Sequence, residues 1–259
     1  MNGRVVLITG ASSGIGRAAA LAFARAGYHT VGIARRADRL ERLAKDICAL
    51  PAPHGDFLPV VGDVTQRSAV ESAVSQTLDR FGRLDILIAN AGIGLRGALI
   101  ESSWQDIERL MHVNIDGVLH SIRAAVPAMQ RSGGGHIMIV SSVVATSPSP
   151  YAACYSASKA FISNLAQAIR VELKPHNIHV SDFRVGRTDT EFNEKRLGEG
   201  QRRPSRIPSM QPEQVAQAML ACAQRPRDVV VVRLFDRLLL LANHLFPALI
   251  THLAARQYR

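Results

Sequence analysis

The chain has 259 residues, of which 47% are hydrophobic and 20% are charged, a composition typical of a soluble globular enzyme with a substantial core. Its formal net charge of +10 is compatible with nucleic acid, an anionic membrane surface or phosphorylated ligands. The basic residues are scattered, however, and only 5% of the residues are aromatic, so no base-stacking platform is visible and we expect no nucleic-acid partner.

The three cysteines, Cys48, Cys154 and Cys222, are odd in number and widely separated, so they indicate neither a disulfide framework nor a zinc site. We expect buried or partly buried thiols and no bound metal. The apolar run near the N-terminus is typical of a strand that leads into a glycine loop and so belongs to the fold. We therefore expect no secretory signal and a reduced, cytoplasmic setting.

The N-terminal segment has the order strand, glycine turn and helix that opens a dinucleotide-binding unit. An apolar run at residues 4–9 is followed by Gly10-Ala-Ser-Ser-Gly14-Ile-Gly16 and by an alanine-rich helix to about Ala26. Glycines let the backbone approach a pyrophosphate, which then lies against the positive N-terminus of the helix. A glycine turn that only packs the helix against the strand is the alternative interpretation.

Two arginines, Arg35 and Arg36, follow the second predicted strand at residues 29–34. An acidic residue at this strand end would bind the 2′-hydroxyl of a cofactor ribose, whereas arginine accommodates a 2′-phosphate. Asp38 lies too far into the next helix to be the obvious acidic ligand. The pattern therefore favours NADP(H) over NAD(H), with a pair of solvated residues at a helix start as the alternative.

Strands and helices alternate along the rest of the chain, a pattern typical of a parallel, doubly wound sheet. Further strands are predicted at residues 57–61, 84–89, 136–140, 178–183 and 228–233. Helices are predicted at residues 38–50, 66–81, 103–129 and 212–224, with another that ends near residue 174. The helix at 103–129 is expected to continue through Asn114 as far as Pro127. We therefore expect one α/β domain over residues 1–259, with about seven strands and helices on both faces of the sheet.

Residues 191–211 do not fit this alternation. They are polar, rich in Gly, Arg and Pro, and without clear periodicity, which is typical of a loop that closes over a substrate. Together with the residues just before them, they form a predicted substrate loop at 187–211.

The C-terminal tail, residues 234–259, is unusually apolar, since no Lys, Arg, Asp or Glu occurs between Arg237 and Arg256. The length of this apolar stretch approaches the roughly 20 residues of a membrane-spanning helix. Three interpretations stay open: a cap over an apolar substrate pocket or a subunit contact, which we favour, a peripheral membrane attachment through residues 234–253, and a true membrane span.

Tyr155 and Lys159 lie four residues apart in a predicted helix and therefore on one face of it. A nearby ammonium group favours the ionised form of tyrosine, so the pKa of the phenol is expected to fall below its usual value of about 10. Such a group can act as a general acid or base in carbonyl–alcohol chemistry. Ser142 lies thirteen residues earlier, just after a predicted strand. An isolated tyrosine–lysine pair of this spacing is more often only a surface contact.

These motifs together resemble the short-chain dehydrogenase/reductase family over nearly the whole chain. The matching residues are Thr9-Gly10-Ala-Ser-Ser-Gly14-Ile-Gly16, Asp63-Val64, Asn90-Ala91-Gly92, Asn114, Ser142 and Tyr155-x-x-x-Lys159. Each pattern is loose, but their order and spacing are jointly highly specific. The chain departs from the family pattern in two places: Ala89 stands where the family usually has Asn, and Val185 stands where it usually has Pro. Val185 lacks the locked φ of proline, so no proline fixes the path of the loop beside the nicotinamide.

The resemblance implies a Rossmann-like fold and a role for each matching residue. Tyr155 would be the acid or base, Ser142 would hold the substrate oxygen, and Lys159 would bind the nicotinamide ribose and lower the tyrosine pKa. Asn114 would anchor a water in a proton relay through Lys159. The implied cofactor-binding residues are Gly10, Ser12, Ser13, Ile15 and Gly16 at the pyrophosphate and ribose, Arg35 and Arg36 at the 2′-phosphate, Asp63 and Val64 at the adenine, Asn90, Ala91 and Gly92 near the nicotinamide ribose, together with Tyr155, Lys159, Val185, Gly186, Thr188 and Thr190.

The resemblance further implies hydride transfer between the nicotinamide C4 and a carbonyl or alcohol carbon of a small-molecule substrate. The apolar tail favours a lipophilic ketone or alcohol. The alternative within enzymes is reduction of a carrier-bound 3-oxoacyl chain, for which the basic surface could dock an acidic carrier protein. A non-catalytic NADP(H) sensor or scaffold is the alternative from another class, but a sensor would need only the cofactor residues. By analogy with the family, we expect a homodimer or homotetramer.

Overall fold

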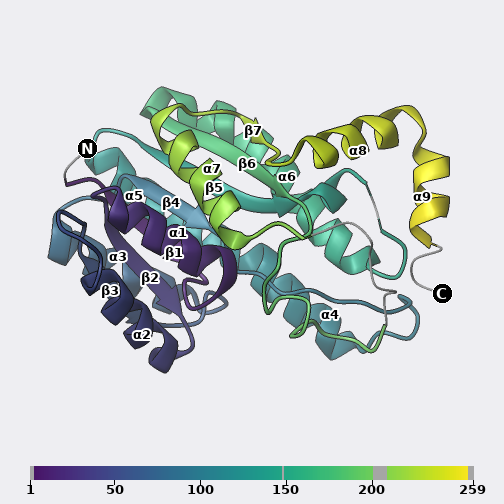
Figure 1. Ribbon diagram of the computed structural model, residues 1–259, viewed down its shortest axis with the longest axis horizontal. Coiled ribbons are helices and arrows are strands. Elements are labelled where there is room, and N and C mark those ends of the chain that lie inside the picture. Colours follow the sequence, from purple (N-terminus) through teal and green to yellow (C-terminus); the bar gives the residue numbers. More distant parts are fainter. Residues whose placement is uncertain (1–2, 148, 201–208, 256–259) are drawn as a thin grey trace.

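A seven-stranded parallel sheet forms the centre of the computed structural model (Figure 1). The structure describes residues 3–147, 149–200 and 209–255, so parts of the predicted substrate loop (201–208) and of the tail (256–259) lie outside it. The strand order is β3-β2-β1-β4-β5-β6-β7, and every neighbouring pair is parallel. The strands are β1 (Val5–Thr9), β2 (His29–Ala34), β3 (Phe57–Val61), β4 (Ile86–Ala89), β5 (Gly135–Ser142), β6 (Ile178–Val185) and β7 (Val229–Val230).

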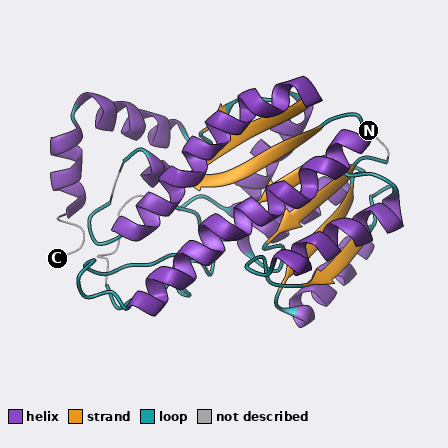
Figure 2. Ribbon diagram, turned by 180° about the vertical axis from the view of Figure 1, so that it is seen from behind, coloured by secondary structure: helices purple, strands orange, loops and turns teal. Residues whose placement is uncertain are grey.

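Helices cover both faces of the sheet, which confirms the predicted fold class. One face carries α1 (Gly14–Arg25), α2 (Ala37–Cys48) and α7 (Pro212–Gln224). The opposite face, which is in front in Figure 2, carries α3 (Arg67–Phe81), α5 (Gly117–Arg131) and α6 (Ala153–Leu173). The remaining helical segments are α4 (Trp104–Met111), a π-helical turn at His112–Asp116, 3₁₀ turns at Val143–Ala145 and Lys174–His176, α8 (Leu234–Leu245) and α9 (Pro247–Ala255).

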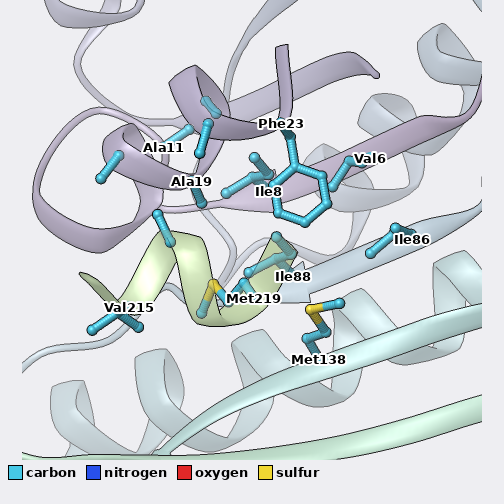
Figure 3. Packing of buried hydrophobic residues seen from close by; sticks show 14 of the residues in the cluster. Val6, Ile8, Ala11, Ala19, Phe23, Ile86, Ile88, Met138, Val215 and Met219 are labelled. Atoms are coloured by element: carbon cyan, nitrogen blue, oxygen red, sulfur yellow. The ribbon is translucent and has the colours of Figure 1, made fainter. Parts of the chain in front are cut away.

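The central strands are apolar along their whole length because helices bury both of their faces. Successive side chains of a strand point to opposite faces, and β1 shows the result. Val6 and Ile8 belong to the core shared with α1 and α7, whereas Val5 and Leu7 belong to the core on the other face. Figure 3 shows the first of these cores, in which small side chains such as Ala19 let α1 pack closely.

The helical region predicted at residues 103–129 is continuous through Asn114, but it is not a uniform α-helix. The turn at His112–Asp116 is π-helical, and the helix continues beyond Pro127 to Arg131. Proline removes one helical hydrogen bond, here the bond to the carbonyl of Arg123. Pro127 and Arg123 are both exposed, so water can bind that carbonyl. The prediction that the helix ends at Pro127 is therefore wrong.

Strand ends and one cysteine also differ from the predictions. β5 and β6 are longer than predicted, so that Ser142 and Val185 are their last residues. β7 has only two residues instead of the predicted six, because α8 begins soon after it and Arg237 of that helix donates a hydrogen bond of 2.9 Å to the Val231 carbonyl. Cys48, at the end of α2, is exposed, which contradicts the expectation of buried or partly buried thiols.

The tail folds into α8 and α9, which extend as a yellow arm from the β7 edge of the sheet in Figure 1. Within residues 3–147, 149–200 and 209–255, no single helix is long and apolar enough to cross a membrane. The pair α8 and α9 passes the same test of length and composition when taken together, but the two helices are bent by 117°.

His136 is buried in the sheet beside a second histidine. Its Nε2 lies 2.8 Å from Ser181 Oγ, and its Nδ1 has no hydrogen-bond partner among the described residues. The ring of His179 on the neighbouring strand is 5.2 Å away, centroid to centroid. Burial, followed by the positive charges of His179 and Arg4, lowers the pKa of His136 to about 3.

This lowered pKa predicts acid sensitivity. In the unfolded chain, His136 has the usual histidine pKa of about 6.5 and binds a proton below that pH. In the folded chain it stays neutral down to about pH 3. The contribution of neutral His136 to the free energy of unfolding is therefore fully present well above pH 6.5. Below that pH, the free energy of unfolding falls by about 1.4 kcal/mol per pH unit. Urea titrations between pH 7.5 and 5 should show that His136→Gln, although less stable at pH 7.5, lacks this slope. The exposed His176→Gln control should keep the wild-type slope, and equal slopes in both variants would contradict the assignment.

Candidate active site

A cavity of about 740 Å³ opens at the carboxyl ends of the strands, where the strand order reverses between β1 and β4. Ligands of doubly wound sheets bind in this crevice. The residues predicted from the sequence to bind a cofactor or take part in catalysis all line the cavity, except Gly16 and Asn114, which lie behind its wall. The structure thus brings together motifs from most of the length of the chain.

The glycine loop between β1 and α1 is shaped to hold an anion. Gly14 has a φ of +52°, a backbone conformation that side chains of L-residues rarely adopt. A Cβ atom on Gly16 would lie 2.4 Å from the Gly10 carbonyl oxygen, so only glycine lets the helix start this close to the strand. No side chain caps α1, and its first amide groups remain available at the cavity. These features fit a pyrophosphate group at the positive end of the helix.

Thr9 ties the loop to the end of β4. Its Oγ1 accepts hydrogen bonds from the backbone amides of Asn90 at 3.0 Å and of Ala91 at 2.9 Å. The Asn90 side chain returns a bond of 2.9 Å to the Thr9 carbonyl. Asn90 therefore holds the two central strands together at the floor of the cavity, and the change from Asn to Ala89 one position earlier leaves this bonding intact.

The arginines after β2 are held in different ways. Arg36 donates hydrogen bonds to Ser12 Oγ at 2.9 Å and to Ser13 Oγ at 2.8 Å, so its guanidinium lies over the glycine loop. Arg35 lies 3.5 Å from an oxygen of Asp63 and is more than half exposed. Arg36 is thus the better placed of the two to meet a ligand that occupies the glycine loop.

Asn114 lies in the π-helical turn, where the wider coil directs its side chain inward. Its Oδ1 accepts a bond of 2.8 Å from the Ile93 amide, and its Nδ2 donates to the Ile93 carbonyl and to Ser158 Oγ, both at 3.0 Å. Ser158 in turn donates to the Tyr155 carbonyl at 2.8 Å. The Asn114 amide therefore connects the β4 end to the first turns of α6, while its proposed role in a proton relay stays a prediction.

The sequence predicted a lowered pKa for Tyr155, and the structure shows the opposite. Burial raises the pKa of Tyr155 to about 12, although a hydrogen bond with Ser142 and the positive charge of Arg96 act to lower it. The Tyr155 side chain is partly exposed, and that surface faces the cavity. Lys159 Nζ lies 6.0 Å from the centroid of the tyrosine ring and donates a bond of 2.9 Å to the Val140 carbonyl. Because burial is the largest cause of the shift, the prediction of a lowered pKa is wrong.

Lys159 is itself almost fully buried, and burial lowers its pKa to about 8 while Asp182 acts to raise it. Asp182 is a fully buried carboxylate inside β6. It accepts hydrogen bonds from Ser141, from Ser163 at 2.6 Å and from Arg184 at 2.8 Å. It therefore links the residue beside Ser142 to the α6 turn that follows Lys159. We did not predict it, although an acidic residue inside an apolar strand pattern was a usable signal.

The far wall of the cavity comes from the loop after β6 and from the tail, and it combines apolar with charged side chains. The Phe192 ring contacts the Tyr155 ring at 5.7 Å between centroids. Asp236 of α8 is paired with Arg233 and packs against Gly186, where a Cβ atom would be 2.3 Å from its carboxylate. Further apolar residues of this wall include Phe235, Leu239, Ile250 and Leu253. Residues of α8 and α9 thus line part of the cavity, while the role of the tail as a cap or a subunit contact stays a prediction.

Comparison with known proteins gives a consistent result. Residues 4–200 match the model of the family described as short chain dehydrogenase. The chain is 34% identical to a dehydrogenase/reductase SDR family protein 7-like of Drosophila melanogaster, over 98% of this chain and 80% of that protein. It is 36% identical to the 3-oxoacyl-[acyl-carrier-protein] reductase of Thermotoga maritima, over 86% of this chain and 91% of that protein. An alcohol dehydrogenase from Thermococcus sibiricus, solved in complex with 5-hydroxy-NADP, aligns with a TM-score of 0.79 at 29% identity, over 88% of this chain and 94% of that one.

The buried pair of Asp182 and Arg184 predicts a large effect on stability. Asp182→Asn should lower the free energy of unfolding by about 3 kcal/mol, because it leaves the mostly buried Arg184 without its charged partner. Asp228→Asn is the matched control, since Asp228 pairs with Arg170 and His179 but is 61% exposed, and its loss should be below about 1 kcal/mol. Denaturant titrations measure both, and similar small losses would show that Asp182 does not hold this network.

Proposed function

The chain belongs to the short-chain dehydrogenase family, and we propose that it is an NADP(H)-dependent oxidoreductase that interconverts a carbonyl and a secondary alcohol on a lipophilic substrate. The observation that carries this proposal is the single cavity that contains Ser142, Tyr155 and Lys159 together with the glycine loop and Arg36. A bound nicotinamide dinucleotide would supply or accept the hydride in this cavity.

The residues of the chain would manage the substrate oxygen and its proton. In reduction, the hydroxyl groups of Ser142 and Tyr155 hold the carbonyl oxygen, and Tyr155 donates its proton to that oxygen as the alcohol forms. A tyrosine with a pKa of about 12 keeps its proton at neutral pH, which suits the role of the acid. Lys159, with a pKa of about 8, is mostly protonated at pH 7 and stabilises the phenolate that Tyr155 becomes.

The preference for NADP(H) rests on charge at the end of β2. Arg35 and Arg36 line the cavity there, and the serines of the glycine loop hold the Arg36 guanidinium in place. A guanidinium binds phosphate oxygens in a planar, paired geometry. Arginines rather than an acidic residue directly follow β2, and Asp63 at the neighbouring strand end is engaged by Arg35 and by Thr65.

The lipophilic substrate is supported by the apolar wall that Phe192 and the tail contribute beside Tyr155. A second candidate is reduction of a carrier-bound 3-oxoacyl chain, which is favoured by the net charge of +10 and by the similarity to the Thermotoga maritima reductase. Rates with a free ketone and with the same acyl chain on a carrier protein distinguish the two substrates.

We further propose that the chain forms a homodimer or homotetramer, or contacts a membrane surface through residues 234–253. The support is the apolar face of α8, on which Leu234, Leu238, Leu241 and Leu245 recur every three or four residues and are exposed. Sedimentation with and without anionic lipid vesicles separates these partners. Faster sedimentation without vesicles indicates self-association, whereas a pellet only with vesicles indicates membrane contact.

Tyr155→Phe tests the chemistry. The loss of the hydroxyl removes the acid, so turnover should fall by at least about a hundredfold while NADPH still binds in a fluorescence titration. Tyr151→Phe is the control, since Tyr151 lies just before α6 and does not line the cavity. Retention of full activity in Tyr155→Phe would overturn the assignment.

The double substitution Arg35→Gln, Arg36→Gln tests the cofactor. It should weaken NADPH binding by more than about tenfold and NADH binding much less, because only NADPH carries the 2′-phosphate that gains charge-assisted hydrogen bonds. Arg42→Gln in α2, where Arg42 is exposed and paired with Asp38 across one turn, is the control for the loss of positive charge. An unchanged ratio of the two dissociation constants would remove the argument for NADP(H).

A further inference from the structure

One carboxylate of the substrate loop is bound by three basic side chains at the cofactor end of the cavity. Glu191 accepts a hydrogen bond from Arg36 at 3.1 Å and further bonds from Arg39 and Lys195. Hydrogen bonds from Lys195, Arg39 and Arg36 lower the pKa of Glu191 to about 2, so it is a permanent anion at neutral pH. Sequence patterns did not single out either Glu191 or Arg39.

This anion lies next to the glycine loop. The preceding residue, Thr190, is so close to the loop that a Cβ atom on Gly14 would be 3.0 Å from its methyl group. Arg36, which holds the carboxylate through Nη1, holds Ser12 and Ser13 of the loop through Nη2. Glu191 is thus bound to Arg36, whose guanidinium group we propose as a ligand of the cofactor 2′-phosphate.

The same segment also reaches the catalytic end of the cavity. Phe192, the next residue, contacts the Tyr155 ring and packs near Gly94. The backbone amide of Lys195 donates to the Glu191 carbonyl at 3.0 Å, so the segment from Thr190 to Lys195 is one compact turn. A shift of Glu191 away from Arg36 would therefore change the wall of the substrate cavity beside Tyr155.

We propose that Glu191 is a specificity-determining residue that competes with a cofactor 2′-phosphate for Arg36 and Arg39, so that NADP(H), but not NAD(H), releases the turn at residues 190–195 from the glycine loop. The inference rests on the proposed NADP(H) site. A phosphate monoester carries nearly two negative charges and three acceptor oxygens, whereas the carboxylate has one charge and two oxygens, so the phosphate is the stronger ligand of two guanidinium groups. Lys195 lies on the same turn as Glu191 and moves with it. The ion pair between the two residues is therefore kept when the turn is released, and it still partly neutralises the Glu191 carboxylate.

The competition links cofactor choice to substrate binding. Because the phosphate and the carboxylate exclude each other on Arg36, a 2′-phosphorylated cofactor alters the position of Phe192, whereas its unphosphorylated counterpart leaves Glu191 bound. By reciprocity, a substrate that needs the shifted Phe192 raises the affinity for the phosphorylated cofactor.

Calorimetric titration with 2′,5′-ADP and with ADP tests the competition without any catalytic step. Glu191→Gln should bind 2′,5′-ADP about fivefold more tightly than the wild type does, because two partly exposed ion pairs no longer have to be broken. Its affinity for ADP should change by less than about twofold. Glu194→Gln is the matched control, since it removes the same charge from the same turn at an exposed residue that does not line the cavity. An unchanged or weaker affinity of Glu191→Gln for 2′,5′-ADP would overturn the proposal.

Arg36→Gln separates this failure from a failure of the cofactor assignment. If Arg36→Gln loses affinity for 2′,5′-ADP while Glu191→Gln shows no gain, the NADP(H) site stands and the competition is wrong. If neither substitution alters the affinity, the 2′-phosphate is bound elsewhere and both ideas fail. If wild type binds the two nucleotides equally and Glu191→Gln prefers 2′,5′-ADP, the competition stands and the natural preference for NADP(H) is wrong.

Hydrogen exchange of the wild-type protein gives a second readout. The amides of residues 190–196 should exchange faster with saturating 2′,5′-ADP than with saturating ADP, because the turn leaves the glycine loop only in the first case. Equal exchange in the two complexes would show that the segment is not released and would overturn the proposal.

Discussion

The parallel pairing of β1, β4, β5 and β6 is the constraint on which the whole site depends. In a parallel sheet all strands end at the same edge, so the residues that follow them meet there even when they are far apart in sequence. The pairing of Ser142 with Val185 and the hydrogen bonds that Asn90 donates to Thr9 fix the positions of the strand ends at that edge. The reversal of strand order between β1 and β4 sends the connecting helices to opposite faces and leaves the crevice open.

Charges buried at this edge give the site its electrostatic character. Lys159 and Asp182 are both buried, and an unpaired buried charge is strongly unfavourable. Lys159 donates a hydrogen bond to the Val140 carbonyl of β5, and Asp182 accepts hydrogen bonds from Ser141, Ser163 and Arg184. The same bonds hold β5 and α6 in register on either side of Ser142 and Tyr155. The stability of this part of the fold and the shifted pKa values of Tyr155 and Lys159 therefore have a common cause. Water has limited access to a dense network of polar side chains.

The opposite wall of the cavity is made by segments that contribute little to the core. Phe192 and the α8–α9 arm complete the apolar side, and Asp236 fastens the arm to the end of β6 at Gly186. Loops and peripheral helices of this kind can change without disturbing the sheet, which is why one fold serves many substrates. The contacts of Glu191 with Arg36 and Arg39 connect this wall to the glycine loop, because Arg36 also binds Ser12 and Ser13.

The sequence by itself determined the alternation of strands and helices, the glycine loop and the positions of Ser142, Tyr155 and Lys159, because each depends on local periodicity or on spacing within one or two elements. Only the tertiary structure decided the π-helical turn around Asn114, the two-residue length of β7 and the direction of the Tyr155 pKa shift. It also decided the contacts of Asp182, Asp236 and Glu191. These features depend on which side chains and carbonyls approach from elements distant in the chain, and on how much water they exclude. A short sequence pattern specifies neither these long-range contacts nor the degree of burial.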